Sequence, residues 1–158
     1  MSNDAPSSDR LIAQNRRASH DYFILETVEA GIQLTGTEVK SLRAGKASLA
    51  EAYASVEGDE AFVRQMHIPP YEQGNRWNQD PVRRRKLLLH RAEIQMLQES
   101  VARKGLTIIP LKLYFSRGFA KLLLGIAKGK KTHDKRHSIA ERDAQREIDR
   151  ARRGGERR

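Results

Sequence analysis

A glycine- and lysine-rich segment near the C-terminus is the part of the chain that most resembles a catalytic motif. Residues 125–132 (GIAKGKKT) have the composition of a loop that cradles nucleotide phosphates. The spacing is wrong for such a loop, because three residues instead of four separate the glycines and a second lysine separates Lys130 from Thr132. We therefore interpret the segment as a flexible cationic exit from the folded part and predict no nucleotide hydrolysis.

The histidines do not indicate a metal site either. The chain has five histidines and no cysteine, and no HExxH pattern occurs. His133 and His137 are four residues apart and could meet on a helix, but two imidazoles without a third ligand make a weak site. In so basic a segment these rings more plausibly stack on a nucleic-acid base. We predict no catalytic residue, metal or cofactor.

Clustered cations suggest phosphate binding instead. Arg83-Arg84-Arg85-Lys86 is the densest cationic run in the folded part and precedes three leucines. Four adjacent charges repel one another unless anions compensate them, so the run is either a solvated loop or a phosphate clamp beside an apolar anchor. Tyr71, Trp77 and His90 are near it in the sequence and could stack on unpaired bases, although Trp77 could equally be ordinary packing.

The last thirty-one residues form a second cationic region. Residues 128–158 contain twelve Lys or Arg, six Asp or Glu, and only two large apolar side chains. Such a segment cannot bury enough apolar surface to offset its ordering, so we expect it to be disordered alone. Ser138 to Glu141 is typical of a helix start, and Arg142, Arg146, Arg150 and Arg153 would align on one side of that helix. The stripe matches a row of phosphates, whereas the alternative is a solvated helix held by its own ion pairs.

Composition excludes several other classes of protein. The chain has 158 residues, a net charge of +10 and a pI near 10.2, which favour a polyanionic partner. No apolar run approaches the roughly 20 residues that span a bilayer, and the C-terminal segment lacks the broad apolar face of a membrane-surface helix. We expect a cytoplasmic monomer with no membrane partner.

Hydrophobic patterning predicts a small, mainly β protein. Alternating apolar and β-branched residues indicate six strands, at 20–29, 31–34, 53–57, 61–66, 111–116 and 119–127. A capping box at Thr35–Glu38 starts one helix, which Gly45 ends, residues 92–104 form another, and 67–81 form a long loop. Six strands with two helices favour a small closed antiparallel β-barrel with flanking helices. We expect residues 1–17 to be a disordered lead-in, 18–127 the barrel and 128–158 the basic tail.

Five stretches in order resemble the SsrA-binding protein (SmpB) family, the RNA-binding partners of transfer-messenger RNA (tmRNA) in bacterial ribosome rescue. They are NRRASHDYF (15–23), EAGIQLTGTEVKSLRAGK (29–46), PYEQGN (70–75), DPVRRRKLLLH (80–90) and AKGKKTHDKR (127–136). The resemblance implies an oligonucleotide-binding (OB) fold without enzymatic activity. It implies that the protein binds the tRNA-like domain of tmRNA, favours its alanylation by alanyl-tRNA synthetase, and delivers it with EF-Tu to stalled ribosomes for trans-translation. The alternative is a general RNA-binding or ribosome-associated protein without tmRNA specificity.

The resemblance also implies roles for individual residues. Those expected to bind RNA are His20, Glu29, Arg43, Lys46, Arg83, Lys86, Leu88 and His90, with Asn15 as a neighbour. Glu29 could contribute only by accepting hydrogen bonds from base amines or ribose hydroxyls. Those expected at the ribosomal decoding centre are Gly129, Lys130, Lys131, His133, Asp134, Lys135 and Arg136. The helix that carries Arg142, Arg146 and Arg150 is expected to occupy the empty mRNA channel.

Overall fold

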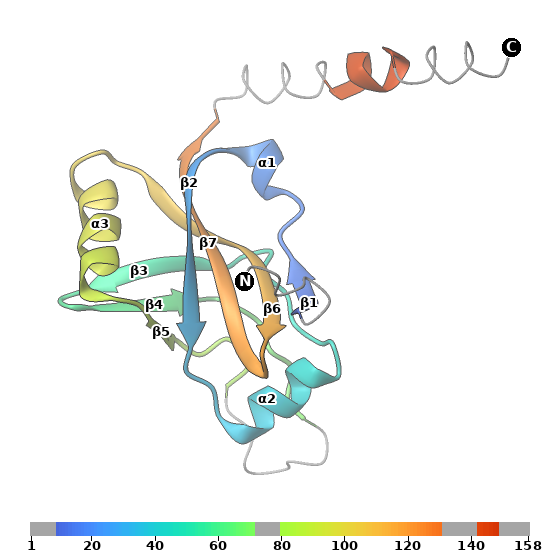
Figure 1. Ribbon diagram of the computed structural model, residues 1–158, viewed down its shortest axis with the longest axis vertical. Helices are drawn as coiled ribbons and strands as arrows, with labels where there is room; N and C mark the ends of the chain where they lie inside the picture. Colours follow the sequence, from blue (N-terminus) through green and yellow to red (C-terminus); the bar gives the residue numbers. More distant parts are fainter. Residues whose placement is uncertain (1–8, 72–79, 131–141, 149–158) are drawn as a thin grey trace, which may run out of the picture.

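The computed structural model describes residues 9–71, 80–130 and 142–148, which form seven strands with flanking helices (Figure 1). In chain order the elements are β1 (Asp9–Gln14), α1 (Ala18–Asp21), β2 (Tyr22–Ile32), α2 (Gly36–Arg43), β3 (Tyr53–Glu57), β4 (Glu60–Arg64), β5 (Arg85–Leu88), α3 (Arg91–Ala102), β6 (Thr107–Ser116) and β7 (Phe119–Gly129). Residues 142–148 form a further short helix. Within the described ranges, no helix has both the length and the apolar character needed to cross a membrane. The mainly β character predicted from the sequence is confirmed.

The strands pair antiparallel in the order β1-β6-β3-β4-β5-β2-β7, and β7 also pairs with β6. Six strands therefore form a closed circuit of pairings, which we call the strand ring, and β1 is attached to it through β6. The circuit is uneven. The β2–β7 and β6–β7 pairings each extend over nine residue pairs, whereas β2 and β5 share two and β3 and β6 share one. In Figure 1, β3 and β4 run across the direction of β2 and β7.

The core lies inside the strand ring. Leu122, Leu124 and Ile126 alternate along β7 and are at most 2% exposed, as their spacing predicted. Helix α3 packs against β3 and β6, and its Ile94 and Leu97 are buried. The strands predicted at 111–116 and 119–127 are also present, as parts of β6 and β7. The β6–β7 hairpin turns at Arg117 and Gly118, which both have positive φ, the geometry of a tight type I′ turn.

Strand β2 replaces the two strands predicted at 20–29 and 31–34. Residues 22–32 are one continuous strand that pairs along its length with β7. Glycine at position 31 allows close approach, because a Cβ there would lie 3.2 Å from the Cβ of Leu88, a tight contact. His20, predicted to begin the first strand, instead lies in α1. Gly31 therefore lets β5 approach β2 and does not turn the chain.

Order also begins earlier than the sequence predicted. Residues 9–14 lie in the expected disordered lead-in, yet they form β1 and pair with β6. Only Ile12 and Ala13 of this strand pack against the core, and both are partly buried. Two apolar residues in a polar stretch are too weak a signal to predict a strand. The strand forms because residues 9–14 pair with β6. The described residues contain seven strands and not six, because β1 and β5 were missed and the strands predicted at 20–29 and 31–34 are one strand.

Helix α2 begins with the capping box expected from the sequence. The Glu38 backbone N–H donates to Thr35 Oγ1 at 3.4 Å, and the Thr35 N–H donates to Glu38 Oε1 at 2.9 Å. Gly45, with φ +78°, follows the helix as predicted. The capping box orients Glu38, which is only 4% exposed, toward the chain that enters β5.

Glu38 holds two arginines from that chain. Its Oε2 accepts from Nε of Arg85 at 2.7 Å, and Arg83 donates to both carboxylate oxygens at 2.6 and 3.0 Å. Arg85 is completely buried and also donates to the carbonyls of Met66, Pro81 and Arg83. The guanidinium therefore joins α2, β5 and the chain around residues 66 and 81. Burying a charged guanidinium costs free energy, and these hydrogen bonds to its donors offset that cost.

Burial alone would raise the pKa of Glu38, but hydrogen bonds from Arg83, the Thr35 backbone and Arg85 outweigh it, so the net pKa is lowered. Burial likewise lowers the pKa of Arg85, against the raising effect of Glu38. A carboxylate whose folded-state pKa is lowered stabilises the fold above its unfolded pKa, and this contribution is lost as the pH falls through the folded pKa. The ion pair thus stabilises the fold at neutral pH and weakens in acid.

Replacing Glu38 with glutamine tests this network. Glu38→Gln leaves Arg85 buried without its counter-charge, so we expect the free energy of unfolding at pH 7 to fall by about 3 kcal/mol. The control is Glu57→Gln, which removes a carboxylate that pairs with Arg64 and Arg84 at the surface and should cost less than about 1 kcal/mol. Urea denaturation measures both.

The same variant has a pH signature. The difference between wild type and Glu38→Gln should begin to shrink below the ordinary glutamate value near 4.5, where the unfolded chain takes up a proton at Glu38. It should be largely lost once the pH falls below the lowered pKa of the folded state, where the wild-type carboxylate is neutral as well. A difference that stayed constant down to the acid unfolding limit would contradict the ion-pair assignment.

Candidate nucleic-acid interface

Strand β5 presents two of the predicted RNA-binding residues on its outer side. It lies between β4 and β2, with Leu87 opposite Ile32 and Leu88 opposite Gly31. Leu87 points into the core and is 1% exposed, whereas Leu88 is 54% exposed and Lys86 is partly exposed. Alternation along the strand thus puts a cation and a large apolar side chain on one face.

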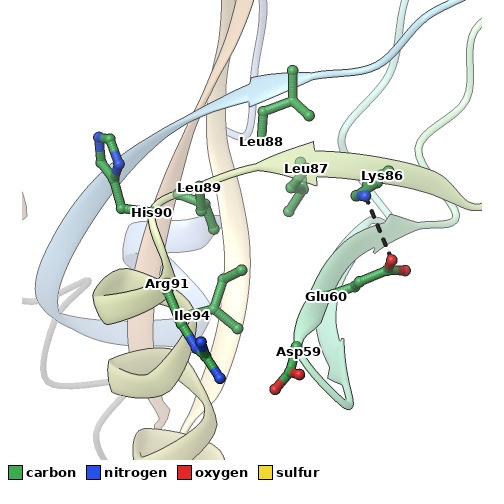
Figure 2. A pocket seen from close by; sticks show the side chains of 9 residues that line it. All are labelled: Asp59, Glu60, Lys86, Leu87, Leu88, Leu89, His90, Arg91 and Ile94. Atoms are coloured by element: carbon green, nitrogen blue, oxygen red, sulfur yellow. Dashed lines mark hydrogen bonds and ion pairs between the residues drawn. The ribbon is translucent and has the colours of Figure 1, made fainter.

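A pocket of about 610 Å³ lies between β5, the start of α3 and the β3–β4 turn. Figure 2 shows Leu87, Leu89 and Ile94 turned toward the hollow, with Arg91 on its α3 side and Asp59 on its hairpin side. Lys86 Nζ lies 3.5 Å from Glu60 Oε1, a weak and exposed ion pair. The lining residues are Asp59, Glu60, Lys86, Leu87, Leu88, Leu89, His90, Arg91 and Ile94. The structure therefore brings together Lys86, Leu88 and His90.

Glu29 lies on the same outer face, two residues before Gly31 on β2. Its Oε2 accepts a hydrogen bond from the Tyr114 hydroxyl of β6, which spans the intervening β7. Leu88 covers Gly31, so Glu29 and Leu88 are close neighbours across β2 and β5. The carboxylate is held by an intramolecular donor and keeps further lone pairs that could accept from a ligand.

The strand register extends this face across the sheet. Leu11, Tyr114, Lys121, Gly31 and Leu88 are successive partners on β1, β6, β7, β2 and β5. Four interstrand spacings make this row roughly 19 Å long. Leu11 and Leu88 are each 54% exposed, and Phe119, two residues before Lys121, is 70% exposed. Sequence reasoning did not single out Tyr114 or Lys121, because only the register aligns them with Leu88.

The basic run is not a loop of free cations. Arg83 is held by Glu38, and Arg85 is buried. Arg85 is therefore neither part of a solvated loop nor part of a phosphate clamp, the two alternatives that the sequence left open. Arg84 donates to Glu57 at 2.9 Å, and its guanidinium lies 4.1 Å from the centre of the Phe62 ring. Glutamates from α2 and the β3–β4 hairpin therefore compensate the charges that phosphates were expected to compensate. Lys86 is the most loosely held of the four.

The other predicted RNA-binding residues lie apart from this group. His20 lies in α1, two residues before β2 begins at Tyr22, and Glu29 comes seven residues after Tyr22, roughly 23 Å along an extended strand. His20 Nδ1 is 2.8 Å from Asp21 Oδ1. Arg43 and Lys46 are exposed at the end of α2, where the Arg43 carbonyl accepts from Arg10 at 2.8 Å. Figure 1 shows α1 and α2 at opposite ends of β2.

Only part of the predicted tail can be placed. Gly129 ends β7 and Lys130 follows it, while Arg142 and Arg146 are exposed in the helix at 142–148. Their four-residue spacing puts them on one side of that helix, as predicted. Trp77 and the predicted tail residues Lys131, His133, Asp134, Lys135, Arg136 and Arg150 lie outside the described residues. Tyr71 is described, and the Lys40 ammonium lies 5.7 Å from its ring centre.

These features define a class of protein. A small β protein whose outer sheet face combines exposed apolar and aromatic side chains with lysines is typical of nucleic-acid-binding β domains. Among the described residues no group of three or more His, Asp or Glu is placed to hold a metal ion.

Comparison with known proteins identifies the family. Residues 12–154 match the family model described as SmpB protein. An SsrA-binding protein of Acetivibrio thermocellus is 61% identical over 92% of this chain and 95% of its own length. That of Bacillus subtilis (strain 168) is 54% identical over 91% and 92%. A solved structure described as "tmRNA-SmpB: a journey to the center of the bacterial ribosome" matches with a TM-score of 0.64 and 57% identity, covering 75% of this chain and 84% of that one. The chain belongs to the SmpB family.

Stability measurements should distinguish the cations that hold the fold together from those that are loosely held and can bind a ligand. Arg83→Gln removes a two-point hydrogen bond to buried Glu38, so we expect it to lower the free energy of unfolding by about 1–2 kcal/mol. Lys86→Gln removes only a loose exposed pair and should change it by less than about 0.5 kcal/mol. Equal effects in chemical denaturation would mean that the two side chains are held alike.

Proposed function

We propose that this chain binds the tRNA-like domain of tmRNA and acts in trans-translation, the rescue of stalled ribosomes. The observation that carries the proposal is the outer face of β5 and β2, where Lys86 and Leu88 lie beside Glu29 and His90. The names of the relatives support it, since two SsrA-binding proteins are each 61% identical over at least 90% of the chain. We propose that the chain is an RNA-binding factor and not an enzyme, and that it acts in the cytoplasm.

We further propose that the strand ring is a closed barrel of the OB type. The closed circuit of antiparallel pairings supports this, as does the position of the candidate interface on its outer face. The division into a barrel and a separate ribosome-binding tail remains part of the proposal. Alanyl-tRNA synthetase and EF-Tu are proposed partners that would act through the RNA complex, with the chain itself monomeric.

The chemistry of the interface suits a folded RNA. Lys86 and Lys121 can contact phosphates as mobile point charges, while exposed Leu88 can pack on a ribose or an unstacked base. Glu29 and His90 offer hydrogen-bonding groups that a uniform phosphate row would not need. Because Glu29 and Glu60 repel phosphates, the surface is expected to favour particular RNA shapes over any polyanion.

Salt dependence separates the two kinds of contact. Lys86→Gln and Lys121→Gln should each weaken binding to the tRNA-like domain and reduce the slope of log affinity against log salt by about one. Leu88→Ala should weaken binding roughly tenfold without changing that slope, because it removes apolar contact alone. Lys104→Gln, an exposed lysine beyond α3, is the charge-matched control.

Ordinary tRNA is the competitor in this titration. A chain that bound tRNA and the tRNA-like domain equally well would be a general RNA-binding protein, and the tmRNA proposal would fail.

Truncation tests the separate role of the tail. A chain ending at Lys130 keeps all of β7, so we expect its melting temperature to be close to that of the full chain. Its affinity for the tRNA-like domain should remain within about twofold of that of the full chain. Peptide tagging on stalled ribosomes should be abolished, because the proposed decoding-centre and channel residues are gone. A marked loss of melting temperature would instead show that the tail packs on the strand ring.

A further inference from the structure

The chain that leaves β7 is fastened to α1 by one residue. The backbone N–H of Lys130 donates to the carbonyl of Asp21 at 2.9 Å, and its ammonium donates to the carbonyl of Ser19 at 2.8 Å. The same ammonium lies 4.8 Å from the centre of the Phe23 ring. Figure 1 shows the end of β7 beside α1 at the start of β2. Lys130 is thus attached at three points to the segment 19–23.

Local structure explains why this attachment forms. The last carbonyls of a helix have no partner within the helix, and α1 has only four residues. Lys130 supplies a backbone donor and a charged donor to two of these carbonyls, and a cation is favoured at the negative end of the helix. Phe23 adds an aromatic face for the ammonium although the ring itself is 42% exposed.

The neighbouring lysine differs. Lys128 pairs in register with Phe23 through the strand backbone, but its side chain is exposed and makes no ion pair, hydrogen bond or ring contact with the described residues. The two lysines have the same charge and lie two residues apart. Of these two lysines only Lys130 is held. Its contacts therefore depend on its place beside α1 and Phe23, and not on the basic composition of the segment.

We infer that Lys130 is a positioning residue that fixes where the C-terminal segment leaves the strand ring. The resemblance treats Lys130 as one of the tail cations that meet the ribosome, but in the structure its ammonium is engaged by the body of the protein. His20 belongs to the same junction, since it bonds Asp21, whose carbonyl receives the Lys130 N–H. The inference rests on the proposed function: a tail that must enter the ribosome while the interface grips RNA needs a defined starting point.

The test compares Lys130→Gln with Lys128→Gln, which loses the same charge, and with Lys130→Arg, which keeps a cationic donor. We measure affinity for the tRNA-like domain, peptide tagging on stalled ribosomes, and melting temperature in the full chain. We expect all three variants to bind RNA within about twofold of wild type. Tagging should fall roughly tenfold in Lys130→Gln, stay near wild type in Lys128→Gln, and be largely restored in Lys130→Arg.

A distance measurement reports positioning directly. The chain has no cysteine, so spin labels can be placed at Glu99→Cys on α3 and Lys131→Cys without removing native thiols. The distance distribution between the labels should broaden when Lys130→Gln is added and should not broaden with Lys128→Gln.

The outcomes are distinct. Equal tagging by Lys130→Gln and Lys128→Gln, or an unchanged distance distribution, overturns the inference. A Lys130→Gln chain that loses melting temperature and RNA affinity together also overturns it, because Lys130 would then serve stability. If wild type itself does not prefer the tRNA-like domain over tRNA, the proposed function fails instead.

Discussion

The buried pair of Glu38 and Arg85 is the constraint on which the interface depends. β5 has only four residues, and it shares three residue pairs with β4 and two with β2, so it is held by few strand hydrogen bonds. Arg85 secures its first residue to α2 through Glu38 and to the chain at Met66 and Pro81. With that end fixed, strand alternation determines that Lys86 and Leu88 face outward and Leu87 inward. A buried charge thus positions the exposed one.

Long periodic elements were predictable because their signals are local. The capping box of α2, the spacing of Ile94 and Leu97 in α3, and the β6–β7 hairpin each follow from a few neighbouring residues. β1 and β5 were not predictable, since each is a short strand that exists through its partners. Gly31 shows the limit most clearly: glycine marks both turns and close approaches, and only the position of Leu88 decides between them.

The candidate site was predictable in part. Family resemblance pointed to Lys86, Leu88, His90 and Glu29, and the structure puts the first three around one pocket, with Glu29 two residues from the β2 partner of Leu88. It separates His20, which joins the exit of β7 through Asp21 and Lys130. Tyr114 and Lys121 carry no signal of their own, because their relation to Leu88 is created by register across three strand pairings. Whether these residues touch RNA remains a prediction.

Net charge is a poor guide to where this protein meets an anion. Arg83, Arg84 and Arg85 form the densest cationic run of the folded part, yet Glu38 and Glu57 already hold all three. Lys130 is likewise engaged, by carbonyls and an aromatic ring. Since an engaged cation must break its bonds before it can bind a phosphate, the loosely held lysines are the better ligands. In the proposed function, the overall charge would steer RNA toward the protein, and the loosely held side chains of the candidate interface would select it.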